Sequence, residues 1–157
     1  IATKKSHKWF VLEAIPEKGV VLTSLDKFLN RNKTKFNKYE TSVARLDSNY
    51  NIYISDAINF GLEKINSPYD NLFTWDDSSY YCSELIYKMF SFQNLSKDSL
   101  PFETNLMTFN DSTGRPMQSW VNYYKSLNYE IPEGKIGTNP NLIASSAHIK
   151  FIHDYDN

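Results

Sequence analysis

The 157-residue sequence predicts an α+β fold in which a mostly antiparallel sheet packs against helices. Three observations predict this class. Two β-rich runs near the N-terminus are separated by a short turn that contains Pro and Gly. Several later segments carry apolar residues at helical spacing, and a last β-rich run closes the chain. The length suits one domain, residues 1–157, and no internal repeat divides it.

The N-terminal third is expected to form strands around one short helix. Residues 8–14 (KWFVLEA) and 19–23 (GVVLT) flank the turn IPEKG and predict an antiparallel hairpin. Ser24 is a suitable N-cap for a helix at 25–31. A further β-branched, alternating run predicts a strand at 39–46.

The rest of the chain is predicted to be mainly helical. Ser55 is expected to cap a helix over 55–65, and a second helix begins at Cys82. Residues 93–116 are polar and weakly patterned, which indicates a loop. The last expected elements are a helix at 117–127, a short helix opened by Asn139-Pro140 and a strand at 148–152. The inward-facing residues of the two long helices are predicted to be Leu85, Ile86 and Met89 in one and Trp120, Tyr124 and Leu127 in the other.

The charge pattern does not indicate a nucleic-acid partner. The net charge is −1, but residues 1–50 carry ten Lys and Arg against five Asp and Glu. These lysines fall in turns and on the outer face of a helix, which favours a solvated surface. No apolar run approaches the length of a membrane span, so stable membrane insertion is not expected.

The few cysteines and histidines exclude several kinds of site. One cysteine excludes an internal disulfide framework and a multi-cysteine zinc site. His7, His148 and His153 show no metal-ligand spacing, so no metal and no other cofactor is predicted. The chain begins without Met, and we expect upstream residues to precede Ile1.

Cys82 has two interpretations that the residue pattern alone leaves open. It follows the polar, aromatic run WDDSSYY and stands in the first turn of a predicted helix. Unpaired N–H groups at a helix start stabilise a thiolate and can form part of an oxyanion hole, which would make the thiol a nucleophile. A lone cysteine is also commonly a small buried apolar residue. A nucleophile needs a base, and His148 is a better partner on position than His7 or His153.

Three segments together resemble a known family. The sequence YYCSELIYKMF, preceded by SPYDNLFTWDD, resembles the Tyr-Asp and Tyr-Cys-Ser-Glu-Leu signature of the YiiX/YaeF branch of the permuted, NlpC-type papain-like cysteine hydrolases. The runs KWFVLEAI, GVVLTSLDKFL and VARL resemble that branch's strand pair, following helix and next strand. The run IPEGKIGTNPNLIASSAHIKFI resembles its C-terminal segment. The resemblance implies a circularly permuted papain-like fold and a cysteine amidase or peptidase.

The resemblance also implies roles for individual residues. Cys82 matches the nucleophile, and Glu13 matches the polar residue that orients a histidine base; a solvated strand carboxylate is the alternative for Glu13. The base is expected shortly before Ile1, upstream of this chain, and not at His148, where the family has an apolar residue. The remaining matched residues, expected to line or shape the substrate cleft, are Tyr69, Asp70 and Tyr81. Pro-Tyr-Asp-Asn is also good turn chemistry in its own right.

The expected substrates are small peptide-like or cell-wall-derived amides, or acyl groups. Two alternatives remain: an acyltransferase or lipid-acyl hydrolase with the same chemistry, and a catalytically inactive binding module. No cofactor is implied. The resemblance suggests the cell envelope or periplasm as location, and the sequence leaves the oligomeric state open.

Overall fold

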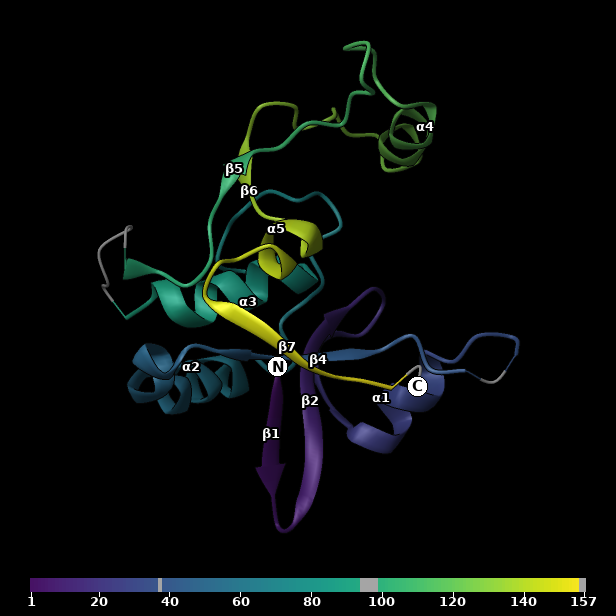
Figure 1. Ribbon diagram of the computed structural model, residues 1–157. Coiled ribbons are helices and arrows are strands. Elements are labelled where there is room, and N and C mark those ends of the chain that lie inside the picture. Colours follow the sequence, from purple (N-terminus) through teal and green to yellow (C-terminus); the bar gives the residue numbers. More distant parts are fainter. Residues whose placement is uncertain (37, 94–98, 156–157) are drawn as a thin grey trace.

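The computed structural model describes residues 1–36, 38–93 and 99–155. A three-stranded antiparallel sheet lies at its centre, in the order β1-β2-β3 (Figure 1). The strands are β1 (Ala2–Lys5), β2 (Lys8–Ile15) and β3 (Gly19–Ser24), and α1 (Leu25–Arg31) follows directly. The predicted hairpin and the helix after it are therefore confirmed.

One face of this sheet carries the main core. Leu12 and Ala14 of β2 are each 2% exposed, and Val20 of β3 is fully buried. Helices α2 (Asn51–Glu63) and α3 (Cys82–Ser91) cover these residues. Because side chains alternate along a strand, Glu13, which lies between Leu12 and Ala14, faces the other side of the sheet, where α1 packs.

The segment after α2 is tied to the open edge of β3. The amide of Val20 donates to the carbonyl of Ser67, and the amide of Asn66 donates to the carbonyl of Val20, both over 2.9 Å. Gly19 makes this approach possible. Its φ is +70°, and an added Cβ would lie 2.0 Å from the Ser67 oxygen. The chain that leads to Cys82 therefore starts beside the turn end of the hairpin.

A second, two-stranded sheet joins distant parts of the chain. Strand β4 (Ser42–Leu46) pairs antiparallel with β7 (Ile149–Asp154). Strand β4 begins three residues later than the predicted strand at 39–46. Figure 1 shows β4 and β7 lying across the central hairpin.

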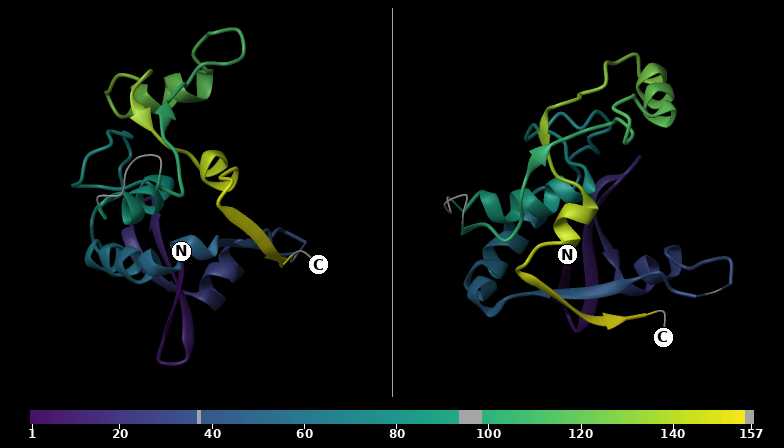
Figure 2. Two further views of the ribbon diagram at one scale, coloured as in Figure 1. Left: turned by 60° about the vertical axis from the view of Figure 1, so that its left-hand side comes forward. Right: turned by 45° about the horizontal axis from the view of Figure 1, so that its top comes forward.

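Residues 105–137, here called the arm, extend away from the central sheet in all three views (Figures 1 and 2). The arm contains β5 (Asn105–Leu106), α4 (Gln118–Ser126) and β6 (Ile136–Gly137), and β5 pairs with β6. The chain then returns through α5 (Pro140–Ala144), whose N-cap Asn139 accepts a hydrogen bond from the amide of Leu142. Asn139-Pro140 thus opens a short helix, as predicted.

Three sequence predictions need correction. Helix α2 begins at Asn51, directly after the 3-10 turn η1 (Ser48–Tyr50), so Ser55 lies inside the helix and is not its cap. Leu127 follows the end of α4 and is 40% exposed, whereas Tyr124 is buried. The predicted loop at 93–116 contains β5, although its residues 94–98 lie outside the described part of the chain.

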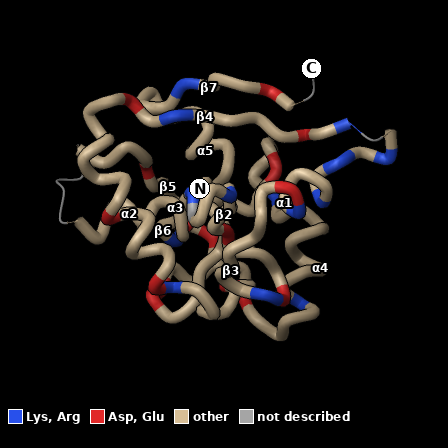
Figure 3. Tube along the Cα trace, turned by 90° about the horizontal axis from the view of Figure 1, so that it is seen from below, with Lys and Arg blue, Asp and Glu red and all other residues tan. Residues whose placement is uncertain are grey.

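Lys and Arg positions are interspersed with Asp and Glu positions along the Cα trace in Figure 3. Within residues 1–36, 38–93 and 99–155, no helix has both the length and the apolar character needed to cross a membrane.

Candidate active site

Helix α3 presents Cys82 as an exposed side chain between buried neighbours. The helix begins at Cys82, after Tyr81 in extended backbone (φ −89°, ψ 167°). Tyr81 and Ser83 are each 2% exposed, whereas the Cys82 thiol is free and exposed. The interpretation of Cys82 as a buried apolar residue is therefore excluded. The thiol lies instead where unpaired helix N–H groups favour negative charge.

A buried ion pair in the first two turns of α3 fixes the start of the helix. Glu84 is fully buried, and its Oε2 accepts a hydrogen bond from the Tyr81 amide over 3.2 Å. Its Oε1 lies 3.1 Å from the Lys88 ammonium. Burial raises the pKa of Glu84 to about 7, and the nearby Lys88 charge offsets part of this rise. Lys88 also donates to the Asp76 carbonyl and the Asp77 carboxylate, at 2.8 and 2.7 Å, so it holds the approach to Cys82.

The approach loop, residues 66–81, is built around Asp70. This side chain is 3% exposed, and its carboxylate accepts hydrogen bonds from the amides of Leu72 (2.8 Å) and Thr74 (2.6 Å). These bonds help to hold Phe73 and Trp75 in left-handed backbone, with φ of +56° and +60°, which is rare for bulky residues. The burial of Asp70 favours a role in shaping the loop over direct contact with a substrate.

Tyr69 is a half-buried residue of this loop that lies within electrostatic range of Cys82. Burial, and after it the electrostatic effect of the neighbouring Cys82, raises the pKa of Tyr69 to about 12. Tyr69 therefore stays a neutral hydroxyl near neutral pH and can donate a hydrogen bond beside the thiol.

Tyr81 is bound to the segment that returns from the arm. Its hydroxyl accepts a hydrogen bond from the Thr138 amide over 3.0 Å, and its ring centroid lies 5.0 Å from that of Phe73. Burial raises the pKa of Tyr81. Ser83, on the other side of Cys82, donates to the Thr138 carbonyl over 3.3 Å. The sequence analysis missed Ser83 and Thr138, because no local pattern links residues 55 positions apart.

Glu13 lies on the face of β2 opposite Leu12 and Ala14, and its contacts run toward α1. Its Oε2 is 2.5 Å from the Arg31 guanidinium, and its side chain is 11% exposed. Its other oxygen, Oε1, is buried and has no hydrogen-bond partner among the described residues. The structure thus groups Cys82 with Tyr69 and Tyr81, while the charged partner of Glu13 is Arg31.

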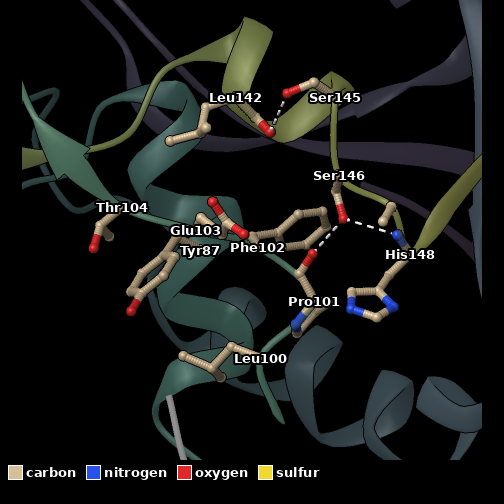
Figure 4. A pocket seen from close by; sticks show the side chains of 11 residues that line it. Tyr87, Leu100, Pro101, Phe102, Glu103, Thr104, Leu142, Ser145, Ser146 and His148 are labelled. Atoms are coloured by element: carbon tan, nitrogen blue, oxygen red, sulfur yellow. Dashed lines mark hydrogen bonds between the residues drawn. The ribbon is translucent and has the colours of Figure 1, made fainter. Parts of the chain in front are cut away.

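The histidines of the chain lie in other settings. His7 is exposed in the β1–β2 turn, with a φ of +65°. His148 is 3.4 Å from the Asp47 carboxylate and packs edge-on against Tyr50. It borders a cavity of about 560 Å³ between α3, α5 and residues 100–104, and Cys82 is not among the residues that line this cavity (Figure 4).

Comparison with known families identifies the family of the chain and its fold. A family described as permuted papain-like amidase enzymes, YaeF/YiiX, C92 family, matches residues 1–153. The chain belongs to this family. Its fold is similar to the crystal structure of the metalloprotein YiiX from Escherichia coli O157:H7, with a TM-score of 0.71 and 18% identity over 97% of this chain and 79% of that one. Comparison with curated proteins gives no match.

The family match confirms the permuted papain-like fold and supports a cysteine hydrolase. The word metalloprotein describes YiiX, and it is not a finding about this chain. Within the described part of this amidase-family chain, no three His, Cys, Asp or Glu side chains gather so that they could hold a metal ion.

Proposed function

We propose that the protein hydrolyses amide bonds of small peptide-like or cell-wall-derived compounds, with Cys82 as nucleophile. The observation that carries this proposal is the exposure of Cys82 at the start of α3, between buried neighbours. A thiol in this position is accessible to a carbonyl carbon, and the amides of the helix start are available to an oxyanion.

The reaction follows the two-step course of cysteine hydrolases. The thiolate of Cys82 attacks the amide carbonyl, and the C–N bond breaks as an imidazolium gives its proton to the departing amine. Water, deprotonated by the same imidazole, then attacks the thioester and releases the acid and the free thiol.

The register of β1 supports a histidine base just upstream of Ile1. Ala2 pairs with Val11, and the Leu12 amide donates to the Ile1 carbonyl over 2.8 Å. If the register of β1 continued upstream, the residue before Ile1 would lie opposite Glu13, and the residue two places further upstream would lie opposite Ile15. Both positions share the face of Glu13, near the hairpin end where the approach loop begins.

The free oxygen of Glu13 supports an orienting role for this carboxylate. Arg31 occupies Oε2, while Oε1 is buried without a partner among the described residues. A buried acceptor of this kind is stabilised by an N–H donor, and an imidazole on the neighbouring strand would supply one. That bond would fix the tautomer in which the other ring nitrogen accepts the thiol proton.

The test uses the full-length protein with p-nitrophenyl acetate as a reactive probe and a muropeptide amide as the class representative. We expect a burst of p-nitrophenol, an acetyl adduct on Cys82 by mass spectrometry, and faster labelling by iodoacetamide at neutral pH than for free cysteine. The variant Cys82→Ala should lose all three, while Ser145→Ala, an exposed serine on α5's C-cap, should keep them.

Replacement of the upstream histidine by Ala should lower turnover by about 10²- to 10⁴-fold and leave the fold intact. An acyl adduct whose acyl group passes only to an added alcohol would identify an acyltransferase. Full labelling resistance of Cys82 in the folded protein, or the lack of an upstream histidine, would favour the binding-module alternative.

A further inference from the structure

The backbone of one residue in the segment that returns from the arm, Thr138, is hydrogen-bonded to both sequence neighbours of Cys82. The amide of Thr138 donates to the Tyr81 hydroxyl over 3.0 Å, and its carbonyl accepts from the Ser83 hydroxyl over 3.3 Å. Tyr81, Ser83 and Thr138 are 2%, 2% and 3% exposed. The exposed cysteine thus stands between two buried hydrogen bonds, here called the anchors, which both end on the backbone of Thr138.

These anchors leave Tyr81 little freedom to move. Its amide donates to Glu84 over 3.2 Å, its carbonyl accepts from the Leu85 amide over 3.0 Å, and its hydroxyl is bound to Thr138. Gly137 allows the return segment to come this close, because a Cβ at that position would lie 3.0 Å from the Tyr81 hydroxyl oxygen. Removing either hydroxyl would leave a buried backbone group of Thr138 without its hydrogen-bond partner. The loss would lower the free energy of unfolding.

We propose that Tyr81 and Ser83 are positioning residues, which act through the backbone N–H and C=O of Thr138 to hold Cys82 in the geometry for attack. The inference rests on the proposed function and adds the arm's return segment to the catalytic apparatus. A nucleophile must approach its carbonyl within a narrow range of distance and angle, and a displacement of about 1 Å costs up to about 100-fold in rate. Two bonds on opposite sides of the cysteine limit both translation and rotation of the helix start.

The kinetic test compares near-isosteric variants that each lose one hydroxyl. Tyr81→Phe and Ser83→Ala should lower kcat for the muropeptide amide, whose turnover is limited by attack and C–N cleavage, by about 10- to 100-fold with little change in KM. Tyr80→Phe is the matched control, because Tyr80 is also fully buried and its hydroxyl donates to a backbone carbonyl, that of Asp77, over 2.9 Å. It should lower the melting temperature by a similar amount and keep kcat within about twofold. The double variant Tyr81→Phe/Ser83→Ala should lose less than the product of the two single losses, because both bonds hold the backbone of the same residue, Thr138.

A second measurement does not depend on turnover or on the variants. Hydrogen exchange by NMR should show strong protection of the Thr138 amide in the unmodified full chain, and Tyr81→Phe should remove this protection while Tyr80→Phe retains it. The rate of iodoacetamide labelling of Cys82 should change in Tyr81→Phe and Ser83→Ala and not in Tyr80→Phe.

The outcomes separate this inference from the proposed function. Rapid exchange of the Thr138 amide in the native protein, or variants that behave like Tyr80→Phe in labelling and kcat, would overturn the positioning role and leave the hydrolase proposal standing. A protein without activity but with a protected Thr138 amide and the expected labelling changes would retain the anchors and refute the hydrolase proposal instead.

Discussion

The hairpin core and the arm are stabilised by different interactions. The core consists mainly of aliphatic side chains from neighbouring segments, with Leu12, Val20 and Met89 almost fully buried. The arm relies on edge-to-face aromatic contacts, such as Phe109 with Trp120 at 5.1 Å between ring centroids. It is attached to the approach loop by tyrosine hydroxyls, including that of Tyr124, which donates to a backbone carbonyl over 3.2 Å.

This difference indicates that the interactions that stabilise the fold are not the same as those that position the loop before Cys82. Burial of aliphatic surface is non-directional and contributes most to the free energy of folding. Hydrogen bonds from Tyr123 to Asn71 and from Tyr124 to Leu72 contribute less, but they fix the loop that precedes Cys82 in one place. The arm therefore orders the site, while the core keeps the domain folded.

The largest effect is expected from truncation in the core. Leu12→Ala should lower the free energy of unfolding by about 2–5 kcal/mol, because Leu12 is 2% exposed and packs beneath α2 and α3. Urea titration measures this change. Leu106→Ala in the arm is the matched control, since Leu106 is 66% exposed, and it should stay within about 0.5 kcal/mol of the unmodified protein. Equal losses in the two variants would contradict the division between core and arm.

The next effect concerns Glu84, which links the two regions through Tyr81. Its pKa is raised by burial to about 7, from a model-peptide value of 4.5. The folded protein therefore binds this proton more tightly than the unfolded chain, so stability from this group is full below about pH 4.5 and is lost as the pH rises to about 7. Relative to Glu84→Gln, the unmodified protein should lose about 3 kcal/mol across this window.

The measurement is a series of urea titrations between pH 4.5 and 7.5. Glu63→Gln, at an exposed position on α2, serves as the control and should run parallel to the unmodified protein. A Glu84→Gln curve that is also parallel would show that the buried carboxylate titrates at its ordinary pKa.

The smallest effect is expected where the arm meets the approach loop. Tyr124→Phe removes the hydroxyl that binds the Leu72 carbonyl and should lower the free energy of unfolding by about 1 kcal/mol. Hydrogen exchange should increase in residues 70–75 and remain unchanged in β2 and β3. Tyr129→Phe, at a residue 49% exposed, should change neither region. Increased exchange in the hairpin would mean that the arm and the core unfold as one unit.

Local sequence patterns predicted the elements whose stabilising contacts lie close along the chain. The hairpin, α1, the start of α3 at Cys82 and the helix opened by Asn139-Pro140 all follow from alternation, helical spacing or cap residues. The start of α2 was mispredicted because Ser55 suits an N-cap, whereas the 3-10 turn before Asn51 already begins the helix. Family resemblance, rather than periodicity, selected Cys82 and Glu13.

Tertiary structure alone decided how the site is held. The meeting of Tyr81 and Ser83 with Thr138 joins residues 55 to 57 positions apart, and the pairing of Glu13 with Arg31 joins a strand to a helix across the face opposite the core. The sequence by itself determined that Cys82 stands at the start of a helix, because helix starts are encoded within a few residues. It could not determine which distant backbone group would fix that cysteine, because any buried hydroxyl has many possible partners until the chain is packed.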